Sequence, residues 1–165
     1  MKKTTIKLIC INATIASLYF VLTVFTQTIA FGPIQLRLGE ALTILPCLIP
    51  SSYIGLSIGC LISNIMSPYG IWDMIFGTII TFIAGILTSK IKDPKLAALP
   101  PILLNAFFLP ILWLFNSANA IYIINVLTTA LSQAVILYLI GVPFYYLTKK
   151  RILPLINLPN NITLK

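Results

Sequence analysis

Long apolar runs, separated by short polar stretches, constrain the fold of this chain more than any other feature. Hydrophobic residues make up 59% of its 165 residues and charged residues only 8%, whereas soluble domains carry about 25% charged residues. Several runs reach the roughly 18 apolar residues that a membrane span needs. In lipid only helices and closed barrels satisfy their backbone hydrogen bonds, and runs without period-two alternation favour helices. The sequence therefore predicts an all-α polytopic membrane protein.

Four of the apolar runs each predict one span. They cover Ile6–Ala30, Ile71–Ser89, Leu96–Phe115 and Ala120–Leu147. A further stretch, Ala41–Met66, would form a single helix about 39 Å long, which exceeds the roughly 30 Å thickness of the hydrocarbon core. The motif "PCLIPSS" (46–52) interrupts this stretch with two prolines and two serines. It therefore divides the stretch into two short spans.

Three clusters of basic residues decide the number and direction of the spans. The clusters are Lys2/Lys3/Lys7, Lys90/Lys92/Lys95 and Lys149/Lys150/Arg151. If residues 41–66 cross the membrane twice, all three clusters face the cytoplasm, as the positive-inside rule requires; a single crossing would put the second cluster outside. We therefore predict a bundle of six transmembrane helices in the cell membrane, with both termini cytoplasmic. Residues 1–150 would form the membrane domain and residues 151–165 a short, irregular cytoplasmic tail.

The composition argues against several other classes of function. The formal net charge is +8, but the basic residues flank apolar runs, so we do not expect nucleic-acid binding. There is no histidine, and the three cysteines lie in apolar runs without a CxxC motif, which argues against a metal site and a disulfide framework. A P-loop and a nucleophile–base pair are also missing, so we expect neither an enzyme nor a bound cofactor. Directed transport would need partner subunits that hydrolyse ATP.

Polar residues gather toward the outer side of the predicted bundle. The stretch "FGPIQLRLGEALTILP" (31–46) places Arg37 and Glu40 three residues apart, in and beside a predicted outer loop at Phe31–Gly39. The other polar or amphipathic candidates, at or below the outer ends of later spans, are Asn64, Trp72, Asp73, Asn105 and Gln133. Carboxylates and amides are costly in hydrocarbon and usually mark a ligand pathway. They pair with ring N–H groups, and aromatic side chains stack on ring faces, so the pattern predicts an outward-facing pocket for a planar, nitrogen-rich ligand.

Within this pocket, Glu40 is the first candidate for a direct ligand contact. Pro33 and Gly39 can fix the bend of the outer loop and let it fold back over the pocket. Arg37 would then be either the partner of Glu40 when the site is empty or a part of the lid.

The same residues also have a purely structural interpretation. Arg37 and Glu40 could form an interfacial ion pair worth ~0–1 kcal/mol, and Asp73 could simply favour a helix N-terminus. The amide side chains could serve as hydrogen bonds between helices. Trp72 and Trp113 could be interfacial anchors. No single residue decides between the two interpretations, but the clustering on one side favours a ligand site.

Several segments resemble one family of membrane proteins. The segments are "NATIASLYFVLT", "FGPIQLRLGEALTILP", "GCLISNIMSPYGIWDMIFGT", "LPPILLNAF" and "LYLIGVPFYYL". In this order, from about Lys7 to about Lys150, they resemble the queuosine-precursor substrate-binding (S) components of energy-coupling-factor transporters. The resemblance implies a six-helix bundle that captures a vitamin-like molecule and docks onto a transmembrane coupling subunit with two ATPase subunits.

The resemblance also implies roles for individual residues. Positions that match the family pattern for ligand contacts are Arg37, Glu40, Asn64, Asp73 and Asn105. The small-residue motif of the first helix, here Ala13 and Ser17, would contact the coupling subunit. Two positions depart from the expected pattern: Ser17 replaces an alanine, and Ser132-Gln133 replaces a Gly-Glu pair. Without that glutamate, either the ligand is a neutral precursor, or Glu40 and Asp73 meet the charge of a cationic aminomethyl group.

The leading hypothesis for function is therefore the capture of a queuosine precursor, a 7-deazaguanine, for ATP-driven import. An S component for another small planar nutrient is the nearest alternative. A membrane scaffold subunit that transports nothing is an alternative of a different class, in which the polar residues only join helices.

Overall fold

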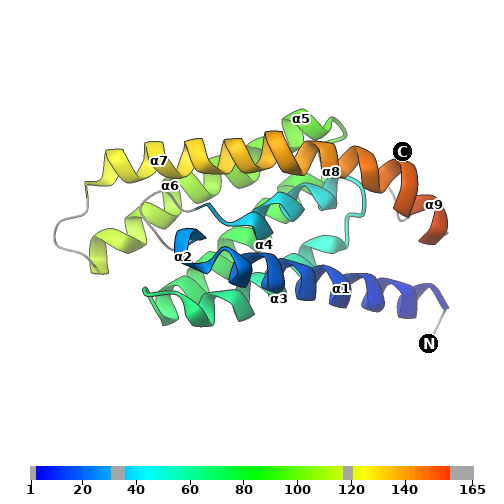
Figure 1. Cartoon of the computed structure of the whole chain (residues 1–165), viewed down its shortest axis with the longest axis horizontal. Helices are drawn as coiled ribbons and strands as arrows, with labels where there is room; N and C mark the ends of the chain where they lie inside the picture. The colour runs from blue at the N-terminus through cyan, green and yellow to red at the C-terminus, as the bar shows by residue number, and fades with distance from the viewer. Residues whose placement is uncertain (1–2, 31–35, 117–120, 157–165) are drawn as a thin grey trace.

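The fold was taken from a computed structural model that describes residues 3–30, 36–116 and 121–156. Within these ranges every regular element is a helix, as the apolar runs predict. Figure 1 shows the helices lying roughly side by side along the long axis of the molecule. Among the described residues, three helical stretches are long and apolar enough to cross a membrane, Thr4–Phe25, Pro94–Leu114 and Tyr122–Ile156. Three shorter apolar helices, Leu38–Cys47, Ser52–Met66 and Asp73–Ser89, lie between them in the chain.

The first half of the chain forms a long helix and then a short, buried one. Helix α1 (Lys3–Phe25) is followed by one turn of helix, α2 (Gln27–Ala30), and by the 3₁₀ helix η1 (Leu38–Cys47). Helix η1 begins three residues before the predicted start at Ala41. Its residues from Gly39 to Cys47 are all buried, so this short helix lies inside the bundle.

The predicted interruption in the stretch 41–66 is confirmed. Helix η1 ends at Cys47 and α3 (Ser52–Ser63) begins after a four-residue turn, because Pro46 and Pro50 cannot donate a backbone hydrogen bond to a continuous helix. The chain then continues through the 3₁₀ turn η2 (Asn64–Met66), the π-helical turn η3 (Asp73–Gly77) and α4 (Thr78–Ser89).

The second half of the chain is a long helical hairpin. Helix α5 (Pro94–Ala97) leads into α6 (Leu99–Asn116), the first arm of the hairpin. The second arm is one continuous helical stretch. Its parts are α7 (Tyr122–Ile136), η4 (Leu137–Gly141), α8 (Val142–Leu147), η5 (Thr148–Ile152) and α9 (Leu153–Ile156). The prediction of an irregular chain directly after Arg151 is therefore wrong as far as Ile156. A helix persists there because residues 148–156 continue the pattern of α8 without a break; residues 157–165 lie outside the described part.

Small residues bring the helices into close contact. A Cβ atom at Gly59 of α3 would lie 2.8 Å from the carbonyl oxygen of Ala16 in α1. A Cβ atom at Gly141 of η4 would lie 2.9 Å from the carbonyl oxygen of Ala41 in η1. Such contacts let helix backbones approach one another in lipid, where no hydrophobic force drives association. The outer surface of the bundle is apolar and exposes large side chains such as Val21, Ile79, Leu127 and Leu139. That surface suits contact with lipid.

The two ends of the bundle differ. Figure 1 shows the start of α1 and α9 at one end, with α5 in the same half of the molecule. This end carries the described lysines of the three basic clusters, and the Nζ of Lys7 near the start of α1 donates a hydrogen bond to the carbonyl oxygen of Ile156 at 3.3 Å. The opposite end contains the turn between η2 and η3 and the start of α7. Five of the polar residues singled out in the sequence come together toward that opposite end.

Candidate functional site

Three ionisable side chains are buried together near the end of the bundle that lies away from the termini. Arg37 precedes the first turn of η1, Glu40 lies within that turn, and Asp73 begins η3. The exposed fractions are 3% for Arg37, 3% for Glu40 and 0% for Asp73. Buried charges are costly unless each one has a charged or hydrogen-bonding partner. The partners of these three groups therefore define the site.

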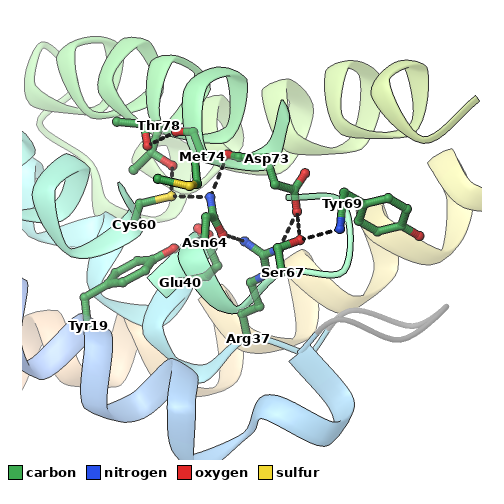
Figure 2. Close-up of polar contacts among 11 residues, drawn as sticks. Tyr19, Arg37, Glu40, Cys60, Asn64, Ser67, Tyr69, Asp73, Met74 and Thr78 are labelled. Carbon is green, nitrogen blue, oxygen red and sulfur yellow. Dashed lines mark hydrogen bonds and ion pairs between the residues drawn. The ribbon is translucent and has the colours of Figure 1, made fainter. Parts of the chain in front are cut away.

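Arg37 forms an ion pair with Asp73. Its Nη2 lies 3.3 Å from Oδ2 of Asp73, and its Nη1 donates to Oδ1 of Asn64 at 2.9 Å. The hydroxyl of Ser67 also donates to Oδ2 of Asp73, at 2.6 Å. Figure 2 shows the guanidinium between the side chains of Asn64 and Asp73, with Ser67 beside it. One carboxylate oxygen of Asp73 thus has both a cationic and a neutral donor.

Asn64 joins this ion pair to the rest of the helix packing. Its Nδ2 donates to the backbone carbonyl of Asp73 at 2.8 Å and contacts Sγ of Cys60 at 3.4 Å. A Cβ atom at Gly77 would lie only 2.7 Å from Nδ2 of Asn64, so the absence of a side chain at this position makes room for the amide. The amide therefore holds η2 against η3 and fixes the orientation of the oxygen that Arg37 binds.

Glu40 has partners from two other helices. The hydroxyl of Tyr19 in α1 donates to Oε1 of Glu40 at 2.6 Å, and Nδ2 of Asn105 in α6 donates to Oε2 at 3.4 Å. The ion pair of Arg37 is thus with Asp73, so the alternative in which Arg37 and Glu40 form an interfacial ion pair is wrong. Both side chains point into the bundle because η1 is itself buried, so the carboxylate meets α1 and α6 rather than solvent.

The local backbone explains how Arg37 and Glu40 come to face different partners. Arg37 has an extended conformation (φ −94°, ψ 105°), and its backbone carbonyl oxygen accepts a hydrogen bond from the backbone N–H of Glu40 at 3.0 Å. The backbone N–H of Leu38 reaches the hydroxyl oxygen of Thr26 at 3.5 Å. This arrangement fixes the start of η1 against the end of α1. As a result, the side chains of Arg37 and Glu40 both point into the bundle.

An aromatic pair lies close to the ion pair. Tyr69 stacks on Trp113 of α6 with ring centroids 5.4 Å apart, and the backbone N–H of Tyr69 donates to the hydroxyl of Ser67 at 3.2 Å. Partial burial, and then the nearby Asp73 carboxylate, raise the pKa of the Tyr69 phenol, so its hydroxyl remains protonated. Trp113 is buried, so the interpretation of this residue as an interfacial anchor is wrong.

Four buried polar atoms on η3, α6 and α7 make no hydrogen bond with the described residues. They are Oδ1 of Asp73, Nε1 of Trp113, Oγ1 of Thr129 and Oε1 of Gln133. Buried polar groups almost always have partners, and each exception needs an explanation. These atoms include both hydrogen-bond acceptors and donors that the described residues leave unused.

The structure brings together five of the seven residues predicted for the substrate site. Arg37, Asn64 and Asp73 form one hydrogen-bonded group, and Glu40 and Asn105 form another. Gln133 is buried on α7, but no hydrogen bond links it to either group among the described residues. Trp72 lies apart: it is 50% exposed and stacks on Phe76 with ring centroids 5.8 Å apart. Whether these residues bind substrate stays a prediction.

Sequence reasoning missed Tyr19 and Ser67, whose hydroxyl groups donate the two shortest hydrogen bonds to the carboxylates, each at 2.6 Å. Tyr19 is the phenolic residue in an otherwise apolar part of α1 and is fully buried. Ser67 lies in the segment "NIMSPYG", between Asn64 and Asp73. A polar side chain within a predicted span, and a hydroxyl between two predicted site residues, were the signals that could have identified them.

Part of the predicted lid lies outside the described residues. Residues 31–35, which include Pro33 and Gln35, lie outside the described part of the chain. The last residues of that loop are described, and Arg37 is buried rather than exposed in a lid. Gly39 packs directly against Tyr19 and Thr23 of α1, which draws this part of the loop into the bundle.

The two residues predicted to contact a partner subunit lie on the surface of α1. Ala13 and Ser17 are exposed, whereas Ala16 is buried against α3. Ala13 borders a groove of about 450 Å³ between α1 and α3, whose lining is almost entirely apolar. The small residues of "ATIAS" thus serve two faces of the helix, one inside the bundle and one outside it.

The comparison with known protein families agrees with the sequence resemblance. A family model described as "QueT transporter" matches residues 9–150. No curated protein and no solved structure matches the chain. The matched region contains all the described residues of the buried polar network, and the match confirms the resemblance to the queuosine-precursor S components. The chain therefore belongs to the QueT transporter family.

Proposed function

We propose that this S component captures its queuosine precursor, a 7-deazaguanine, from outside the cell and holds it at the buried network around Arg37, Glu40 and Asp73. The observation that carries this proposal is the burial of all three ionisable groups at one end of an otherwise apolar bundle. Intramembrane ionisable groups are costly and are retained mainly at ligand or ion sites. The free Oδ1 of Asp73 is an acceptor for a ring N–H group.

The proposed topology has six membrane crossings with both termini in the cytoplasm. Three long and three shorter apolar helices supply the crossings. In Figure 1 the start of α1, α5 and α9 lie in the same half of the molecule, which supports this topology, because all three basic clusters would then lie on the cytoplasmic side. The buried network consequently lies toward the outside of the cell membrane, where a nutrient arrives.

Import would depend on an energy-coupling-factor module. We propose that the exposed face of α1 around Ala13 and Ser17 contacts the transmembrane coupling subunit, because small side chains let another helix approach closely. The chain itself would act neither as an enzyme nor as a cofactor-binding protein, and two partner ATPase subunits would consume the ATP. The groove beside Ala13 supports this assignment, since its apolar lining can receive the side chains of a second helix.

Ligand binding by the purified protein tests the proposed function. A 7-deazaguanine at about 100 times its Kd should stabilise the detergent-solubilised protein by about 2.7 kcal/mol, which is measurable as a rise in Tm. Glu40→Gln and Asp73→Asn should weaken binding at least about tenfold, whereas Asp93→Asn and Leu38→Ala should leave it nearly unchanged. Asp93 is a suitable control because it is a carboxylate exposed at the opposite end of the bundle.

Three results would contradict the proposal. If all four variants bind equally well, the buried network is not the site. If no 7-deazaguanine raises the Tm but another compound retained from cell extract does, the protein is an S component for a different nutrient. The absence of any stabilising ligand would favour a scaffold in which the polar residues only join helices.

A further inference from the structure

We propose that a groove between α1 and the helical stretch from α8 to α9 binds one anionic phospholipid. An acyl chain would lie in the groove, and the phosphate headgroup would bind the basic residues beside it. The groove lies apart from the buried polar network, so this inference goes beyond the proposed function and does not depend on which nutrient the network binds. Only the assignment of the lipid to the cytoplasmic leaflet rests on the proposed topology.

The groove has the size and lining that an acyl chain needs. Its volume is about 320 Å³, and its lining is almost entirely apolar. Residues 10–18 of α1 form one wall, residues 144–156 form the other, and the buried Leu45 and Ile49 lie between them. At 1.5 Å per residue the wall on α1 is about 12 Å long, and one leaflet contributes about 15 Å of hydrocarbon. The groove therefore fits an acyl chain from a single leaflet.

Basic side chains lie beside both walls of this groove. Lys7 lies three residues before the lining residue Cys10, so the two are neighbours on the surface of α1. The Nζ of Lys7 also donates to the carbonyl oxygen of Ile156, a lining residue of the other wall, at 3.3 Å. Arg151 is exposed and lies three residues after the lining residue Thr148. Each wall thus contributes a cation near the same end of the groove.

The charge around this end of the groove is positive and complements a phosphate group. All three acidic residues of the chain are described, and none of them lines the groove. Glu40 and Asp73 belong to the buried network, and Asp93 caps the start of α5. Basic pockets between transmembrane helices on the cytoplasmic side bind anionic headgroups. The charge therefore favours an anionic phospholipid over a zwitterionic one.

A hydroxyl group lies between the apolar and the basic parts of the second wall. Thr148 is 4% exposed, and its Oγ1 makes no hydrogen bond with the described residues. It follows the lining residue Phe144 by one helical turn and directly precedes the basic residues 149–151. This order of ring, hydroxyl and cations parallels the acyl chain, ester and phosphate of a phospholipid. An ester carbonyl oxygen would accept a hydrogen bond from Thr148, which a buried hydroxyl requires.

The lipid would not cover the surface proposed for the coupling subunit. That surface, around Ala13 and Ser17, borders the other groove on α1, which lies beside α3. The two grooves share no lining residue. The phospholipid site and the coupling surface therefore occupy different faces of the same helix.

Competition between two phospholipids with identical acyl chains tests this inference. The purified full chain in detergent would be mixed with equal amounts of anionic dioleoyl phosphatidylglycerol and zwitterionic dioleoyl phosphatidylcholine, and the retained lipid would be measured by native mass spectrometry. The anionic lipid should be retained at least about fivefold more strongly, the effect of one basic residue. The double variant Lys7→Gln with Arg151→Gln should lose most of this preference. Lys92→Gln with Lys95→Gln, which removes the same charge near α5, should keep it.

A pair of tryptophan substitutions tests the position of the acyl chain. Leu18→Trp enlarges a side chain that lines the groove, whereas Val21→Trp changes a residue of α1 that is 57% exposed and does not line it. Each buried CH₂ group strengthens lipid binding about fourfold, so a block that excludes two of them should lower the retention of both lipids at least about tenfold. Val21→Trp should leave the retention unchanged. In lipid-free detergent all four variants should unfold near the Tm of the unchanged protein, which shows that they are folded.

Four results would overturn the proposal. Equal retention of the two lipids would exclude an anionic headgroup site. Equal loss of preference in the two double variants would show that overall charge, and not this groove, attracts the lipid. Unchanged retention in Leu18→Trp would place the lipid elsewhere. A dimer that Leu18→Trp abolishes, without retained lipid, would assign the groove to a second copy of the chain. None of these results bears on the proposed function, because nutrient binding at the buried network is measured separately.

Discussion

The two ends of this bundle use charged side chains in opposite ways. At the end that holds the termini, the described lysines are exposed, and the carboxylate of Asp93 accepts a hydrogen bond from the backbone N–H of Lys95 at 3.0 Å as a helix N-cap. At the other end three ionisable groups are buried at 3% exposure or less and are held by side chains from several helices. In the proposed topology the exposed charges would orient the chain in the membrane, whereas the buried ones depend on tertiary structure for every partner.

This difference has an energetic consequence. An exposed charge that loses its partner is solvated by water or lipid headgroups, so the loss costs little. A buried charge that loses its partner has no substitute, so the loss costs several kcal/mol. Matched substitutions at the two ends should therefore differ widely in their effect on the free energy of unfolding.

The largest effect is expected for Arg37→Met. This change leaves Asp73 and Glu40 as two buried carboxylates without a cation, which should destabilise the protein by about 3–5 kcal/mol. The measurement is unfolding in mixed micelles or thermal unfolding in detergent. Arg151→Met at the basic end is the matched control and should change stability by no more than about 0.5 kcal/mol.

The double variant Arg37→Met with Asp73→Asn sharpens this comparison. Removing the unpaired carboxylate should restore part of the loss, because the two groups form one ion pair at 3.3 Å. If the two single changes are instead additive, or if Arg151→Met destabilises as strongly as Arg37→Met, the contrast between the two ends is wrong.

A smaller effect is expected when one phenolic hydroxyl is removed at each end. Tyr19 donates to a buried carboxylate at 2.6 Å, whereas Tyr138 donates to the backbone carbonyl of Lys95 at 3.1 Å from an exposed position. Tyr19→Phe should cost about 1.5–3 kcal/mol, because hydrogen bonds to charged groups are the stronger class. Tyr138→Phe should cost no more than about 1 kcal/mol. If Tyr19→Phe and Tyr138→Phe lower the free energy of unfolding by the same amount, Glu40 is already neutral.

Much of the fold could be predicted because lipid leaves few alternatives. Apolar runs without period-two alternation require helices, and Pro46 and Pro50 correctly predicted the break before Ser52. The sequence could not show that η1 lies inside the bundle, because every residue in "ALTIL" is compatible with either lipid or a protein core. The burial of Arg37 and Glu40 follows from that central position and not from local sequence.

The sequence predicted where the site lies, but not which charged side chains pair with one another in it. Arg37, Asn64 and Asp73 were recognised as polar residues at the same end, yet Arg37 and Asp73 are 36 positions apart. Their contact depends on how η3 packs beside η1, whereas proximity in sequence suggested the pair Arg37 and Glu40. The two tryptophans show the same limitation, because residue type alone cannot distinguish an anchor at the surface from a ring in the core.

The smallest effect is expected for Trp72, and it tests that distinction directly. The chain has two tryptophans, so Trp72→Phe and Trp113→Phe each leave a single fluorophore. Trp72 is 50% exposed and Trp113 only 4%. In nanodiscs with brominated lipids, fluorescence from Trp72 should be quenched more strongly than that from Trp113. Trp72→Phe should change stability by no more than about 0.5 kcal/mol, as for most surface substitutions, and ligand affinity less than about twofold. Stronger quenching of Trp113, or a large loss of affinity in Trp72→Phe, would place Trp72 in the site and Trp113 at the lipid surface.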